Sequence, residues 1–100
     1  MKNETESAES SVLTEKEIFN AQLYSRYTNP EFMKKLIQSV RAAFVGSYDW
    51  GKMEIKYLYC EKSVPRFRVN WWDWDSDKIN RSEFITVTEE KEELIIGVRN

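Results

Sequence analysis

Apolar residues in the first half of the chain recur at steps of three and four, which predicts two amphipathic helices. Thr14 and Glu17 have the spacing of a capping box, so we expect the first helix over residues 14–27. Asn29 followed by proline is typical of a helix start, and the second helix is expected over residues 30–44. Each helix has one apolar stripe that we expect to face the core: Ile18, Phe19, Leu23 and Tyr27 in the first, and Met33, Leu36, Ile37, Val40, Ala43 and Phe44 in the second.

The period of the apolar positions changes from about 3.6 to 2 in the second half of the chain. Gly46 is placed to end the second helix in the left-handed conformation, and the alternation begins after Gly51. The predicted strands are Met53–Tyr59, Arg66–Trp72, Glu83–Thr88 and Leu94–Val98. Their connections are too short for parallel crossovers. The sequence therefore predicts an α+β fold, with two N-terminal helices packed on one face of a four-stranded antiparallel meander sheet.

Strand parity assigns each side chain to the helix-covered inner face or to the outer face. The inner set is Ile55, Tyr57, Tyr59, Phe67, Val69, Trp71, Ile85, Val87, Leu94, Ile96 and Val98. The outer set is Lys56, Leu58, Cys60, Arg66, Arg68, Asn70, Trp72, Trp74, Phe84, Thr86, Thr88, Ile95 and Arg99. A solvated outer face should be polar, yet this one contains three aromatic rings and two aliphatic side chains.

Length and composition predict one domain, with 41% hydrophobic residues providing enough apolar side chains for a core. Residues 1–12 are expected to be a disordered acidic tail, and residues 13–100 a single α+β domain. The acidic start lacks the apolar stretch of a signal peptide and no run is long enough to span a membrane, so we expect a cytoplasmic protein without membrane contact. The first 17 residues hold two of the 15 basic and five of the 17 acidic residues, which leaves residues 18–100 nearly neutral.

Two residue counts limit the chemistry. The chain has no histidine, which excludes Ser-His and Cys-His catalysis, and Cys60 is the only cysteine, which excludes an internal disulfide and a thiolate zinc cage. We therefore expect a protein that is not an enzyme and has no cofactor, and no small-molecule substrate is evident. Cys60 is interpreted as a half-buried strand residue.

The aromatic and basic residues of the outer face form the candidate partner-binding site: Trp72, Trp74, Phe84, Arg66, Arg68, Lys56 and Leu58. Exposed aromatic rings beside arginine are typical of protein-binding hot spots. We expect another protein or a second copy (a homodimer) as the partner, in an inhibitor, an adaptor or an accessory protein. The alternatives are local packing of the rings and a single-stranded nucleic acid as partner. Nucleic acid ranks below protein because Asp73 and Asp75 flank Trp74 and repel phosphate.

The acidic segment at Asp73, Asp75 and Asp77 begins like the calcium-binding loop of an EF-hand. The match ends at Lys78, which stands where that loop needs glycine, and Glu83 comes one position too early. We interpret the segment as a solvated loop, and weak divalent-ion binding remains the alternative.

Overall fold

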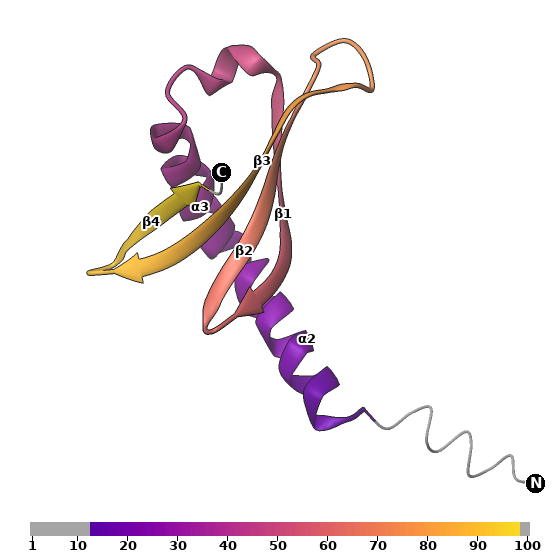
Figure 1. Cartoon of the computed structure of the whole chain (residues 1–100), viewed down its shortest axis with the longest axis vertical. Helices are drawn as coiled ribbons and strands as arrows, with labels where there is room; N and C mark the ends of the chain where they lie inside the picture. The colour runs from indigo at the N-terminus through magenta and orange to yellow at the C-terminus, as the bar shows by residue number, and fades with distance from the viewer. Residues whose placement is uncertain (1–12, 99–100) are drawn as a thin grey trace, which may run out of the picture.

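The computed structural model describes residues 13–98, in which two helices precede a four-stranded antiparallel sheet (Figure 1). The predicted acidic tail, residues 1–12, lies outside the described residues. The elements are α2 (Glu15–Tyr27), α3 (Pro30–Ala43), the 3-10 helix η1 (Ser47–Trp50), β1 (Lys52–Glu61), β2 (Val64–Trp72), β3 (Ile79–Glu90) and β4 (Glu93–Val98). The strands lie in the order β1-β2-β3-β4. This confirms the predicted α+β meander, although β3 is longer at both ends than expected.

Both helices begin at the predicted caps. The Thr14 hydroxyl accepts a hydrogen bond from the Glu17 amide at 3.1 Å, and the Glu17 carboxylate accepts one from the Thr14 amide at 2.8 Å. At α3, the Asn29 side-chain oxygen accepts a hydrogen bond from the Glu31 amide at 2.9 Å. Gly46 follows α3 with a φ of 86°, in the left-handed region that glycine adopts without strain. The hydrogen bonds of the Thr14, Glu17 and Asn29 side chains satisfy backbone amides that a helix start leaves unpaired.

The core lies between α3 and the inner face of the sheet. Trp71 is fully buried, and its ring contacts those of Phe44 and Trp50 at centroid distances of 5.3 and 4.9 Å. The buried apolar residues are Tyr27, Leu36, Val40, Phe44, Phe67, Val69, Trp71, Ile85, Val87 and Leu94. The strand residues among them all belong to the predicted inner set, whereas Val98 of that set is exposed.

The first helix packs less than the sequence indicated. Only Tyr27 in its last turn is buried, and Leu23 is half-buried. Ile18 and Phe19, which we expected in the core, are exposed. The reason is visible in Figure 1, where the N-terminal half of α2 extends past the β1–β2 turn and has no sheet beneath it.

A bulge in β1 overturns two face assignments. Tyr57 pairs with Phe67, but the next pair along the strands is Tyr59 with Arg66, so Leu58 is an extra residue in β1. Because the side-chain alternation shifts by one residue there, Tyr59 lies on the outer face, and Cys60 lies on the inner face against the core. The sequence assigned the two residues the other way round.

Candidate functional site on the outer face of the sheet

The outer face is the side of the sheet away from the helices. Leu23 and Tyr27 of α2 and the buried residues of α3 all belong to the core on the inner side. The strand register places three rows of side chains across β1, β2 and β3 on the outer face. These rows are Glu54–Asn70–Ser82, Lys56–Arg68–Phe84 and Tyr59–Arg66–Thr86.

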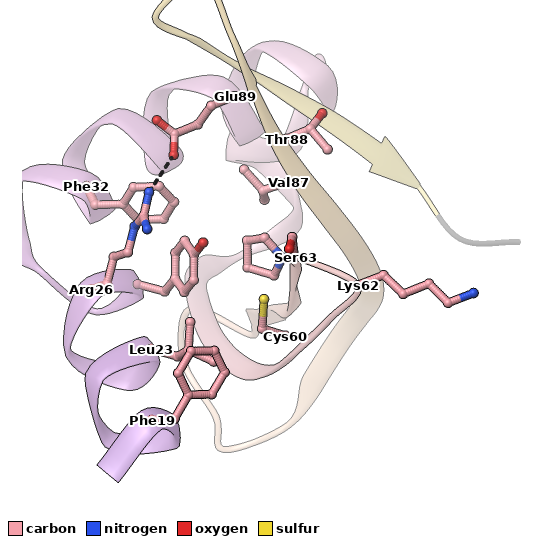
Figure 2. A pocket seen from close by; sticks show the side chains of 12 residues that line it. Phe19, Leu23, Arg26, Phe32, Cys60, Lys62, Ser63, Val87, Thr88 and Glu89 are labelled. Carbon is pink, nitrogen blue, oxygen red and sulfur yellow. Dashed lines mark ion pairs between the residues drawn. The ribbon is translucent and has the colours of Figure 1, made fainter. Parts of the chain in front are cut away.

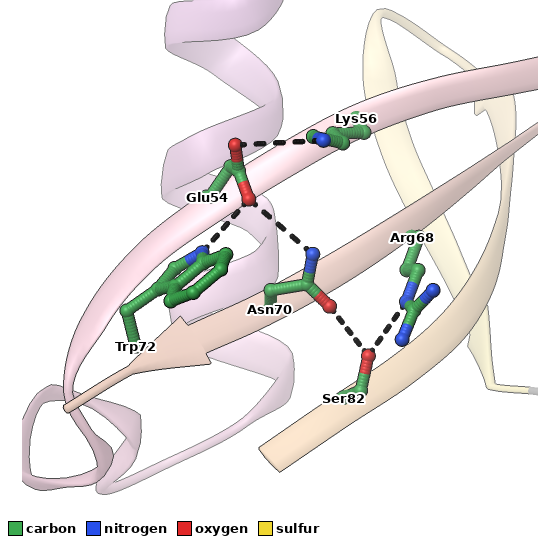
Figure 3. Close-up of polar contacts among 6 residues, drawn as sticks. All are labelled: Glu54, Lys56, Arg68, Asn70, Trp72 and Ser82. Carbon is green, nitrogen blue, oxygen red and sulfur yellow. Dashed lines mark hydrogen bonds and ion pairs between the residues drawn. The ribbon is translucent and has the colours of Figure 1, made fainter. Parts of the chain in front are cut away.

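The first row forms a polar network with its neighbours (Figure 3). The Trp72 indole N–H donates to Glu54 Oε1 at 2.8 Å, and the Asn70 amide donates to the same oxygen at 3.3 Å. The Ser82 hydroxyl donates to Asn70 Oδ1 and accepts from Arg68 Nε at 2.8 Å. The network therefore joins three strands and fixes the rotamers of side chains that would otherwise be free to move.

Glu54 carries the negative charge of this network. The indole N–H of Trp72 holds the pKa of the Glu54 carboxyl below its ordinary value, against the opposing effect of partial burial. The Asn70 amide and the Lys56 ammonium, 4.0 Å from Glu54 Oε2, act in the same direction as Trp72. The outer face therefore has a carboxylate on its β1 edge at neutral pH.

The second and third rows hold the exposed aromatic rings. Phe84 is 47% exposed, and the Arg68 guanidinium lies 5.5 Å from its ring centroid. Arg66 pairs with Glu61 at 3.3 Å and lies 5.9 Å from the ring centroid of Tyr59. A shallow hollow of about 70 Å³ separates the rings. Its outer-face lining is Leu58, Tyr59, Arg66, Phe84 and Thr86.

The structure brings most of the predicted site together and separates one residue from it. Six of its seven residues are on or beside the outer face, as the strand parities predicted: Lys56, Leu58, Arg66, Arg68, Trp72 and Phe84. Trp74 is not on this face. It follows the end of β2, and its ring centroid lies 5.6 Å from that of Tyr48 in η1. Sequence reasoning missed Tyr59, because nothing in the alternation of β1 marks the bulge.

The acidic loop is closed by its own hydrogen bonds. The Asp75 amide donates to Asp73 Oδ1 at 3.0 Å, and the Asp73 amide donates to the Lys78 carbonyl at 2.7 Å. Among residues 13–98, no three acidic or cysteine side chains are placed so that they could hold a metal ion. Asp77 belongs to the same exposed turn.

A second surface feature is an open groove of about 600 Å³ between α2 and the end of the sheet that holds the β1–β2 turn. Figure 2 shows Phe19 and Leu23 of α2 on one side of it, and Cys60 and Val87 on the other. An ion pair of 3.7 Å joins Arg26 to Glu89 across the groove. Sequence analysis did not predict this groove, because it assigned the apolar side chains of the N-terminal half of α2 to the core.

No family model, curated protein or solved structure matches this chain. Within the part of the chain that the structure describes, neither helix has the length and apolar content needed to cross a bilayer.

Proposed function

We propose that this chain is a protein-binding module that docks a partner protein on the outer face of its sheet, centred on Phe84, and acts by binding and not by catalysis. The observation that carries the proposal is the exposed Phe84 ring beside Arg68, on the side of the sheet that neither helix covers. Contiguous exposed apolar side chains rimmed by polar ones are characteristic of interaction sites. Tyr59 and Leu58 enlarge the apolar area around Phe84 through the shared hollow.

The polar network supports the proposal because it holds the surface in one conformation before a partner arrives. Arg68 reaches the Phe84 ring while its Nε donates to Ser82, so its position is fixed from two sides. A rigid surface loses less side-chain entropy on binding, which leaves more of the contact energy as affinity. Aromatic rings and arginine are also the residues that most often dominate such affinities.

The charges of the face favour a protein partner over a single-stranded nucleic acid. Glu54 is a carboxylate on the edge strand β1 of the face, and Arg66 is paired with Glu61. A phosphate backbone would have to break the Arg66–Glu61 ion pair and lie close to the Glu54 carboxylate. A protein surface can instead complement both signs of charge.

The test is affinity capture from the source cells with three immobilised proteins: wild type, Phe84→Ser and Phe19→Ser. Phe84 and Phe19 are both about half exposed but lie on different surfaces, so Phe19→Ser controls for the loss of an exposed ring. We expect a protein retained by wild type and by Phe19→Ser, and lost with Phe84→Ser. With the purified partner, Phe84→Ser should cost about 1–3 kcal/mol of binding free energy. An RNA or DNA component lost with Phe84→Ser would favour the nucleic-acid alternative.

A further inference from the structure

Arg68 differs from the other two cations of the outer face in having no carboxylate beside it. Lys56 lies 4.0 Å from Glu54, and Arg66 lies 3.3 Å from Glu61. Within the part of the chain that the structure describes, Arg68 belongs to none of the ion pairs. Among the described residues, the face therefore has one guanidinium whose charge is not compensated.

The guanidinium of Arg68 is also held in position. Its Nε donates to the Ser82 hydroxyl at 2.8 Å, and Ser82 is itself fixed by its hydrogen bond to Asn70 (Figure 3). Its Cζ lies 5.5 Å from the ring centroid of Phe84. The two Nη groups make no hydrogen bond within the described residues, and they are not among the buried atoms that lack a partner. Arg68 thus presents both Nη groups to solvent from a fixed position.

The hollow beside Phe84 fits the tip of an aliphatic side chain. Its volume is about 70 Å³, and most of its lining is apolar: Leu58, Tyr59, Phe67, Phe84 and Ile85. A cavity that binds benzene measures about 150 Å³, so this hollow is too small for an aromatic ring. Because Phe84 borders the hollow and also contacts the Arg68 guanidinium, a side chain in the hollow and a group bound to Arg68 would be neighbours.

We propose that Arg68 binds a carboxylate of the partner protein, and that the partner presents this acidic side chain beside an aliphatic one that enters the hollow next to Phe84. The inference rests on the proposed function, because it specifies the chemistry of the partner on the same face. Two open Nη groups donate two parallel hydrogen bonds to one carboxylate, which adds direction to the attraction of the charges. Ser82 is then a positioning residue, since it fixes Arg68 before the partner binds and so reduces the entropy lost on binding.

The charges of the face favour a carboxylate over a phosphate backbone as the group that Arg68 binds. One carboxylate carries one negative charge and matches one uncompensated guanidinium. A run of phosphates needs several cations, whereas Arg66 and Lys56 already lie beside Glu61 and Glu54. An acidic side chain of a protein is therefore the better match.

The experiment is selection of random peptides displayed on phage against the immobilised full chain, followed by affinity measurements on the enriched peptides in solution. Wild type, Arg68→Lys, Phe84→Ser and Arg41→Lys are compared. Arg68→Lys keeps the positive charge but loses the planar pair of donors. Arg41 is an exposed residue in the last turn of α3, so Arg41→Lys is the same substitution away from the outer face. Near-UV circular dichroism verifies that each variant keeps the core.

We expect the enriched peptides to share an acidic residue close to a leucine, isoleucine or valine. Arg68→Lys and Phe84→Ser should each weaken their binding about tenfold or more, and Arg41→Lys should leave it within about twofold of wild type. Ser82→Ala should also weaken binding, and Ser82→Thr, which keeps the hydroxyl, should restore it. Replacing the acidic residue of the peptide by its amide should abolish the effect of Ser82→Ala, because a positioning residue acts only through the contact that it positions.

The contrary results separate this inference from the proposed function. Peptides that Phe84→Ser weakens and Arg68→Lys does not would overturn the carboxylate contact and leave the protein-binding face in place. Peptides that neither substitution weakens, or no enrichment on wild type, would overturn both. A single-stranded oligonucleotide that displaces the peptides from wild type at physiological salt would identify phosphate as the ligand of Arg68 and overturn the inference too.

Discussion

At the residue scale, the two adjacent tryptophans of β2 have opposite environments. Trp71 is fully buried against Phe44 and Trp50, whereas Trp72 is half-buried on the outer face and donates its indole N–H to Glu54. The strand requires this, since neighbouring side chains point to opposite faces. Trp71 therefore stabilises the core, and Trp72 stabilises the polar network of the outer face.

The adjacent pair provides a prediction about stability. Trp71→Ala should lower the free energy of unfolding by about 3–5 kcal/mol, because it leaves a large cavity in the core. Trp72→Ala should lower it by only about 1–2 kcal/mol, through one lost hydrogen bond and part of a ring's burial. Urea unfolding of the two variants measures both values. A larger loss for Trp72→Ala would mean that the two faces of β2 are interchanged.

A second prediction at this scale concerns Glu54 and pH. Its pKa is lowered in the fold, so its charge stabilises the folded state above the unfolded-state pKa of about 4.3, and this contribution is lost as pH falls through the lower folded-state pKa. Glu54→Gln keeps an oxygen acceptor for Trp72 but removes the charge. We expect Glu54→Gln to be less stable than wild type by about 0.5–1 kcal/mol at neutral pH, a modest value because the carboxyl is partly exposed.

Urea unfolding of wild type and Glu54→Gln at neutral pH and again in acid measures this difference. The gap between the two proteins should close in acid, because Glu54 is then protonated in both the folded and unfolded states. A gap that stays constant with pH would mean that the Glu54 charge contributes nothing to the network.

At the element scale, the sequence predicted what local rules determine and missed what backbone irregularities determine. Thr14 and Asn29 identified both helix starts, because capping is a local contact. The assignment of Tyr59 failed because the bulge at Leu58 leaves no mark in the alternation. The exposure of Phe19 was also beyond prediction, since an apolar stripe does not reveal where the sheet beneath it ends.

The two hairpin turns are strained elements. Lys62 and Ser63 connect β1 to β2 with φ values of 53° and 66°, and Lys91 and Glu92 connect β3 to β4 with φ values of 52° and 67°. A left-handed backbone costs a non-glycine residue roughly 1–2 kcal/mol. Two-residue hairpin turns with both residues left-handed favour the sequence Asn-Gly.

Replacing Lys62-Ser63 by Asn-Gly should therefore raise the stability by about 1 kcal/mol. The measurement is the urea midpoint at an unchanged slope, which separates a stability change from a change in the unfolded state. The same replacement at Lys91-Glu92 is the matched control turn and should act in the same direction. An unchanged or lower midpoint in both turns would contradict the strain.

At the scale of the whole molecule, both helices pack on one side of the sheet, and this arrangement leaves two uncovered surfaces. One is the outer face around Phe84, and the other is the overhanging half of α2 with its groove. The two surfaces lie on opposite faces of the sheet, because the groove is lined by core-side residues such as Cys60 and Val87 and the outer face by Arg66 and Phe84.

The central claim is that the outer face contacts another protein, and photo-crosslinking from position 84 in the source cells tests it most directly. Phe84 is replaced by a benzophenone-bearing phenylalanine analogue, and the same analogue at Tyr48, which is 74% exposed on η1, is the control for random collisions. We expect a discrete adduct with one protein from position 84 and none with that protein from position 48. The same adducts from both positions, or an adduct with nucleic acid from position 84, would contradict the claim.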